Sequence, residues 1–218
     1  MPLNDTIRTT DGIRIYLWNP VETSQELLRI LEKDTICSDT ILTDTKKYPE
    51  KRLCEILTVR ILIKQVFGNN AQLAYLPSGA PYIKNFDGHI SISHTKSCIA
   101  LAIHKSEIIG IDVENKTEKI QRIQKKFINR QEAEQLSPEN SITGLTFLWS
   151  AKESLYKAIQ MPSVDFSRHL HVTPINPSAT SGSVSAYQTR TQTPVYYRIH
   201  YRVYPDYILT AAIKNDNT

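Results

Sequence analysis

The spacing of hydrophobic and polar residues changes along the chain between a period of two, typical of strands, and a period near 3.6, typical of helices. Short alternating runs predict strands at 13–18, 89–93, 99–103 and 108–114. Helical spacing predicts a helix that begins near Thr23 or Ser24, and a longer helix over 53–67 that Gly68 ends. The first half of the chain is therefore predicted to contain both helices and strands.

The second half repeats this mixture. Helical spacing predicts one helix within 115–134 and a central helix over 147–158, and the small polar residues of 176–183 predict a loop. Two alternating runs, at 195–203 and 207–213, flank a Tyr-Pro-Asp turn and predict a hairpin. The hairpin echoes the one predicted over 90–103.

The central helix carries two charged residues one turn apart. Apolar residues at 148, 151, 155 and 158 form one stripe that faces a core, whereas Glu153 and Lys157 project from a shared face. An isolated pair of this kind is usually a surface ion pair of small energetic value. The alternative is that both side chains point at a bound charge.

The predicted strand at 108–114 carries two carboxylates. Asp112 and Glu114 are two residues apart, so they lie on one face while Ile111 and Val113 enter the core. Two acids on one strand face repel each other unless a cation lies between them. Carboxylates completed by substrate phosphates are typical of a Mg²⁺ site, and Glu153 is a candidate third ligand.

Composition and charge exclude few classes of protein. The 218 residues suffice for one domain or two small lobes, and 40% hydrophobic and 22% charged residues are ordinary for a globular protein. The net charge of +4 suits an acidic protein partner or a polyphosphate and is too small to indicate nucleic acid. Cys37, Cys54 and Cys98 lack metal-ligand spacing and are expected to be reduced thiols. No apolar run suggests a signal peptide or a membrane span, so we expect a cytoplasmic protein with no membrane contact.

Four motifs together resemble the 4'-phosphopantetheinyl transferase superfamily, in particular its longer, pseudo-duplicated type that acts like holo-acyl-carrier-protein synthase. The first two are Gly79-Ala80-Pro81-Tyr82, similar to a Gly-Lys-Pro segment, and Ile90-Ser91-Ile92-Ser93-His94, similar to an Asn-Ile-Ser-His-Ser segment. The other two are Gly110-Ile111-Asp112-Val113-Glu114 and the run 149–157, Trp-Ser-Ala-Lys-Glu-Ser-Leu-Tyr-Lys. They occur in the family's order, and the resemblance covers roughly residues 50 to 175.

The resemblance implies a reaction and a set of residues. A member would move the 4'-phosphopantetheine arm of coenzyme A to a serine of an apo acyl or peptidyl carrier protein and release 3',5'-ADP. It implies Mg²⁺ on Asp112, Glu114 and Glu153, with Glu153, directly or through a metal-bound water, as the base and Lys157 as the group that stabilises or protonates the leaving phosphate. The remaining implied contacts are with coenzyme A and involve Lys51, Arg52, Gly79, Ser93 and His94. Because Ala80 stands where the family has a lysine, only a backbone role is expected for Gly79.

The fold implied by the resemblance is α+β, with two pseudo-symmetric lobes whose small antiparallel sheets pack on helices and whose active site lies at the seam. We expect an N-terminal lobe over 1–114 and a C-terminal lobe over 115–218, and a monomer. The basic residues Lys119, Arg122 and Lys126 follow Glu114 closely and are a candidate docking face for an acidic carrier, although a charged helix face is usually only solvated.

Two other functions use the same residues. A Mg²⁺-dependent nuclease or phosphohydrolase would employ the same carboxylates, with a more basic groove. A non-catalytic module that binds coenzyme A or a carrier would need the fold without the acids, and the presence of Asp112, Glu114, Glu153 and Lys157 argues against it.

Overall fold

The computed structural model describes residues 5–32, 47–136, 141–173 and 179–215. Within these ranges, none of the helices combines the length and the apolar character needed to cross a membrane. The fold is α+β with antiparallel sheets, as expected. Cys37 and part of the loop predicted at 176–183 lie outside the described residues.

The N-terminal half forms a four-stranded antiparallel sheet covered by two helices. Its strands, in spatial order, are β1 (Asp5–Arg8), β2 (Arg14–Trp18), β6 (Ile99–His104) and β5 (His89–His94). The helices are α1 (Ser24–Glu32) and α2 (Glu50–Phe67), and a small hairpin of β3 (Leu73–Tyr75) and β4 (Pro81–Ile83) connects α2 to β5. Gly68 caps α2 with a φ of 90°, a conformation that favours glycine.

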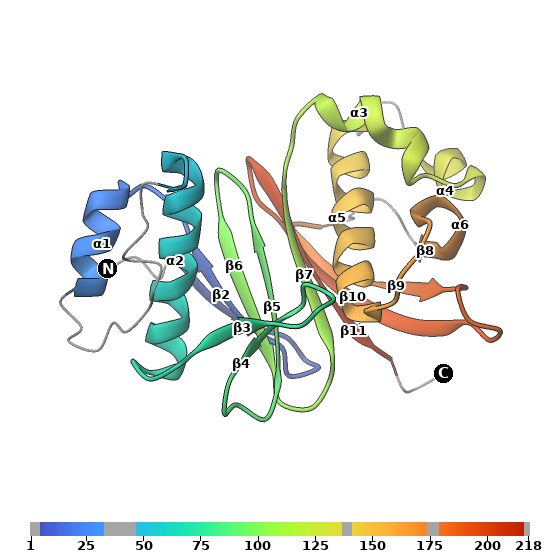
Figure 1. Cartoon of the computed structure of the whole chain (residues 1–218). Helices are drawn as coiled ribbons and strands as arrows, with labels where there is room; N and C mark the ends of the chain where they lie inside the picture. The colour runs from blue at the N-terminus through green and yellow to red at the C-terminus, as the bar shows by residue number, and fades with distance from the viewer. Residues whose placement is uncertain (1–4, 33–46, 137–140, 174–178, 216–218) are drawn as a thin grey trace.

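The C-terminal half forms a five-stranded antiparallel sheet. Its spatial order is β7 (Ile109–Asn115), β11 (Tyr207–Lys214), β10 (Val195–Val203), β9 (Ser181–Gln188) and β8 (Leu170–Thr173). The helix α5 (Ser141–Ile159) covers this sheet (Figure 1). Three short helical segments and α6 (Phe166–His169) lie near α5. The segments are α3 (Lys119–Ile123), the 3-10 helix η3 (Gln124–Lys126) and α4 (Arg130–Gln135).

The two halves stack as four layers, helix, sheet, sheet and helix (Figure 1). Alternation along β7 separates two faces: Ile111 and Val113 are buried between the sheets, whereas Asp112 and Glu114 lie on the other face, toward α5. Small residues on β6, such as Ala100 and Ala102, let the sheets approach each other. Polar contacts add to this seam, since Asp11 accepts bonds from Arg198 Nη1 and His200 Nε2, each at 2.7 Å.

The structure corrects two sequence predictions about the second half. The single helix predicted within 115–134 is broken, because Asn129 caps a new helix: its side chain accepts from Glu132 N–H while the Glu132 carboxylate accepts from Asn129 N–H. The strands β8 and β9 were not predicted, and β9 extends into the loop predicted at 176–183. The division at residue 114 stays a prediction, although β7 is hydrogen-bonded to β11 and so belongs to the second sheet.

Candidate active site

The strand β7 and the helix α5 meet at Gly110. A Cβ added there would overlap the carbonyl oxygen of Ser154 and come within 2.8 Å of Ala158 N, so only glycine permits this close approach. Gly110, Asp112 and Glu114 share the face of β7 that looks toward α5. The contact at Gly110 therefore brings the carboxylates of the strand to the charged face of the helix.

Asp112 is buried and its two oxygens have different surroundings. Oδ1 accepts from Ser93 Oγ–H at 2.9 Å and from Lys157 Nζ at 2.9 Å. Oδ2 is buried and has no hydrogen-bond partner among the described residues. A buried carboxylate oxygen without a partner is costly, so Asp112 is suited to an additional positively charged ligand.

The other two predicted acids lie within the electrostatic reach of Asp112. Burial raises the pKa of Glu153 to about 7, and the charge of Asp112 acts in the same direction while Lys157 opposes it. Burial also raises the pKa of Glu114, and the negative charge of Asp112 raises it further, whereas a hydrogen bond from the Trp149 side chain lowers it. The three carboxylates thus repel one another and face one ammonium group, a balance that favours binding of a cation.

The described residues contain no group of three or more histidine, cysteine, aspartate or glutamate side chains arranged to hold a metal ion. The chemistry of the donors nevertheless fits a divalent cation of the Mg²⁺ type. The three groups are oxygen donors, and Asp112 Oδ2 is buried without a partner.

Lys157 joins the helix α5 to the strand β7 at this site. Its ammonium donates to Ile111 O at 2.8 Å and to Asp112 Oδ1 at 2.9 Å, which uses two of its three N–H bonds. The side chain also lines a cavity of about 470 Å³ between the segment 78–81, β5 and the end of α5. Lys157 can therefore contact both the carboxylates and a molecule in that cavity.

A second cavity, of about 340 Å³, contains three of the residues expected to contact coenzyme A. Arg52, Gly79 and His94 lie in its lining, and Arg52 Nη1 is 3.2 Å from His94 Nε2. Glu55 holds Arg52 through an ion pair of 3.0 Å. Lys51 is exposed and outside this lining, and Ser93 is buried against Asp112.

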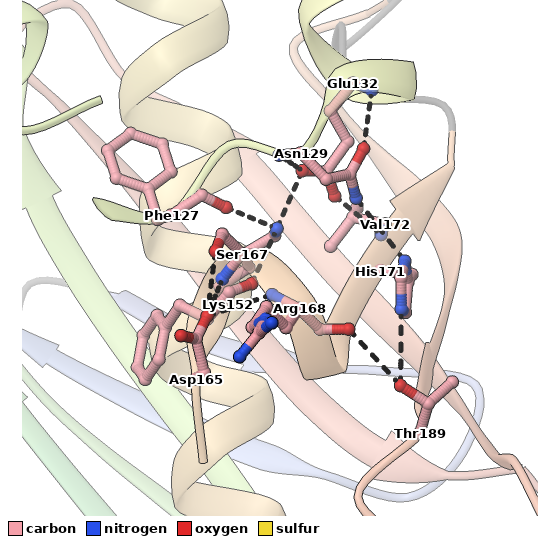
Figure 2. A network of polar contacts seen from close by, with 11 residues as sticks. Phe127, Asn129, Glu132, Lys152, Asp165, Ser167, Arg168, His171, Val172 and Thr189 are labelled. Atoms are coloured by element: carbon pink, nitrogen blue, oxygen red, sulfur yellow. Dashed lines mark hydrogen bonds and ion pairs between the residues drawn. The ribbon is translucent and has the colours of Figure 1, made fainter. Parts of the chain in front are cut away.

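The residue before Glu153 has a different environment. Lys152 is fully buried, and its ammonium donates to Glu132 Oε2 at 2.7 Å, to Phe127 O at 2.6 Å and to Phe166 O at 3.0 Å (Figure 2). Glu132 in turn accepts from the backbone N–H groups of Asn129 and Val172. This network ties α4, α6, β8 and the residue after η3 to α5, so the position of α5 depends on it.

Sequence reasoning missed the partners that hold the site in place. Lys152 and Trp149 belong to the run 149–157, but neither was given a role, and Glu132 was one acid among several on a charged segment. One signal was present in the sequence: Asn129 followed three residues later by glutamate is a capping-box pattern, which predicts a helix start at Asn129 and a bond from its backbone N–H to the Glu132 carboxylate.

Comparison with known protein families matches part of the chain. Residues 108–212 match the family model described as the 4'-phosphopantetheinyl transferase superfamily. No curated protein matches the chain. The matched segment contains β7, α5 and the final hairpin, and therefore Asp112, Glu114, Glu153 and Lys157.

Proposed function

We propose, from the match of residues 108–212 to the 4'-phosphopantetheinyl transferase superfamily, that the protein transfers the 4'-phosphopantetheine arm of coenzyme A to a carrier protein. The acceptor is a serine of an apo acyl or peptidyl carrier protein, and 3',5'-ADP is released. The observation that carries the proposal is the meeting of Asp112 on β7 with Glu153 and Lys157 on α5, since the pKa of Glu153 is raised in part by Asp112.

The reaction is a phosphoryl transfer in which one P–O bond forms and one breaks. The serine oxygen attacks the phosphorus that carries pantetheine, and the P–O bond to 3',5'-ADP breaks. The serine proton must be removed, and the negative charge on the departing phosphate must be stabilised. Acid–base catalysis of this kind is worth about 10²- to 10⁴-fold in rate.

Glu153 is the proposed base. A base is most effective when its pKa lies close to the working pH, and burial raises the pKa of Glu153 to about 7. Lys157 is proposed to stabilise or protonate the leaving phosphate. Its ammonium uses two N–H bonds for Ile111 O and Asp112 Oδ1, and the third can donate to a phosphate oxygen. In these roles Glu153 would contact the serine hydroxyl and Lys157 the leaving phosphate.

Asp112, Glu114 and Glu153 are the proposed ligands for Mg²⁺. When bound, the ion would neutralise charge on the pyrophosphate of coenzyme A. The buried, unpartnered Oδ2 of Asp112 supports this assignment.

The nucleotide end of coenzyme A is proposed to bind beside β5 and the start of α2. The cavity that Arg52, Gly79 and His94 line supports this location, since a cationic guanidinium there suits the 3'-phosphate. The residues proposed for this end are Lys51, Arg52, Gly79, Ser93 and His94.

The exposed basic residues after β7 are the proposed docking face for the carrier. Lys119, Arg122 and Lys126 are exposed on α3 and η3, whereas the nearby apolar side chains of Ile120 and Phe127 are buried and unable to form a docking contact. Charge complementarity with an acidic carrier would speed and orient the encounter. We expect the protein to act as a cytoplasmic monomer.

A transfer assay tests the proposed function. The protein is incubated with coenzyme A, Mg²⁺ and several apo carrier proteins, and the carriers are weighed by mass spectrometry. We expect one carrier to gain the mass of one phosphopantetheine, and Glu153→Gln to lose more than about nine tenths of the turnover, because the amide is not basic. Hydrolysis of a simple phosphodiester without transfer would favour a phosphohydrolase instead.

A further inference from the structure

Two serine side chains bridge the two sheets beside the proposed active site. β5 is the edge strand of the first sheet and β7 is the edge strand of the second. Ile111 N–H donates to Ser91 Oγ at 3.0 Å, and Val113 N–H donates to Ser93 Oγ at 3.3 Å. Both hydroxyls are buried, so each replaces the carbonyl group of a neighbouring strand and satisfies a buried N–H group.

Only one of the two serines has a described second contact. Ser93 Oγ–H donates to Asp112 Oδ1, the oxygen that Lys157 also holds. Two donors on a single oxygen restrict rotation of the carboxylate and leave Oδ2, the buried oxygen without a described partner, as its open coordination position. Among the described residues, no bond joins Ser91 Oγ to a carboxylate.

We infer that Ser93 is a positioning residue that orients Asp112 so that Oδ2 is presented to a divalent cation. This role is separate from the contact with coenzyme A proposed above for Ser93, and it deepens the proposed function, on which the identity of the cation rests. Ser93 acts through Asp112 and does not touch the reacting atoms. The bond network also explains why a serine, and not an alanine of similar size, occupies a buried strand position.

Ser91 provides a matched control. Ser91→Ala and Ser93→Ala each leave one buried N–H of β7 without its acceptor, so both variants are expected to lose similar stability in chemical unfolding. Only Ser93→Ala also removes one of the two donors to Asp112 Oδ1, which leaves Lys157 as the other. Ser93→Thr keeps the hydroxyl and suits a strand position, so it serves as the conservative variant that remains informative if the alanine variant folds poorly.

The experiment measures Mn²⁺ binding by electron paramagnetic resonance, at a coenzyme A concentration that saturates each variant. We expect Ser93→Ala to weaken Mn²⁺ binding about 10- to 100-fold, the usual effect of removing a residue that orients a metal ligand. Ser91→Ala and Ser93→Thr are expected to stay within about threefold of the wild type. This measurement needs no carrier protein, so its outcome is separate from that of the transfer assay.

The inference is overturned if Ser91→Ala and Ser93→Ala weaken Mn²⁺ binding equally, because the effect would then come from the strand contact alone. It is also overturned if Ser93→Ala binds Mn²⁺ as the wild type does, or if the wild type binds no Mn²⁺. A selective loss in Ser93→Ala that Ser93→Thr restores supports it.

Discussion

Replacing Lys152 with methionine should destabilise the protein strongly although Lys152 is not proposed to touch substrate. The change keeps a long apolar stem and removes the ammonium that donates to Glu132 and to two backbone carbonyl groups. Glu132 would then be a buried carboxylate without its cation, since both side chains are buried. The physical cause of the loss is the charge left unpaired.

The expected loss of folding stability in Lys152→Met follows from the burial of this ion pair. Removing one partner of a buried ion pair costs about 3–5 kcal/mol. For a chain of 218 residues, each kcal/mol lowers the Tm by about 2–4 °C, so Lys152→Met should melt about 6–20 °C below the wild type. Adding Glu132→Gln removes the second charge, but its single amide oxygen can accept from only one of the N–H groups of Asn129 and Val172, which donate to different carboxylate oxygens. The double variant should therefore recover only part of the loss, about 1–3 kcal/mol.

The measurement is chemical and thermal unfolding of four proteins: wild type, the two single variants and the double variant. The exposed pair of Arg130 and Glu134, with side chains 92% and 65% accessible, is the control, and Arg130→Ala should cost no more than about 0.5 kcal/mol. A Tm for Lys152→Met within about 3 °C of the wild type, or a double variant no more stable than Lys152→Met, would refute the reasoning.

Three further changes test the site. Gly110→Ala should cost about 1–3 kcal/mol or more and lower transfer activity, because its Cβ would displace the backbone of α5; unchanged unfolding would contradict the close approach of β7 and α5. Arg52→Ala or His94→Ala should raise the KM for coenzyme A much more than that for dephospho-coenzyme A, since only the former carries the 3'-phosphate and a charged hydrogen bond is worth about 1.5–3 kcal/mol. Equal increases for both substrates would remove these residues from the phosphate contact. Changing Lys119 and Arg122 together to glutamate should lower kcat/KM for the carrier at low salt and flatten its salt dependence, with the KM for coenzyme A unchanged; unaltered carrier kinetics would place docking elsewhere.

The sequence by itself determined the features that follow from local periodicity. Alternation on β7 assigns Ile111 and Val113 to the core and the two acids to the other face, and the structure confirms this separation. The buried stripe of α5 was likewise predicted from three- and four-residue spacing, and Leu148 and Leu155 are fully buried. These patterns depend on neighbours within one turn or one strand, so they are visible without the fold.

The strand β9 shows where local reasoning ends. Its sequence, Ser-Gly-Ser-Val-Ser-Ala-Tyr-Gln, has few of the residues that favour strands, and it becomes one because β10 supplies a partner over its whole length. Pairing of this kind is set by the other strand and not by the segment itself.

The polar contacts of the site were decided by tertiary structure alone. Lys152 and Glu132 are 20 residues apart, and Ser93 and Asp112 are 19 apart. On paper Lys152 and Lys157 are two lysines of one helix, yet one is sealed inside an ion pair and the other joins a carboxylate at the seam. Which role each takes depends on what packs against that side of α5, because a buried charge is stable only where the fold provides its partners.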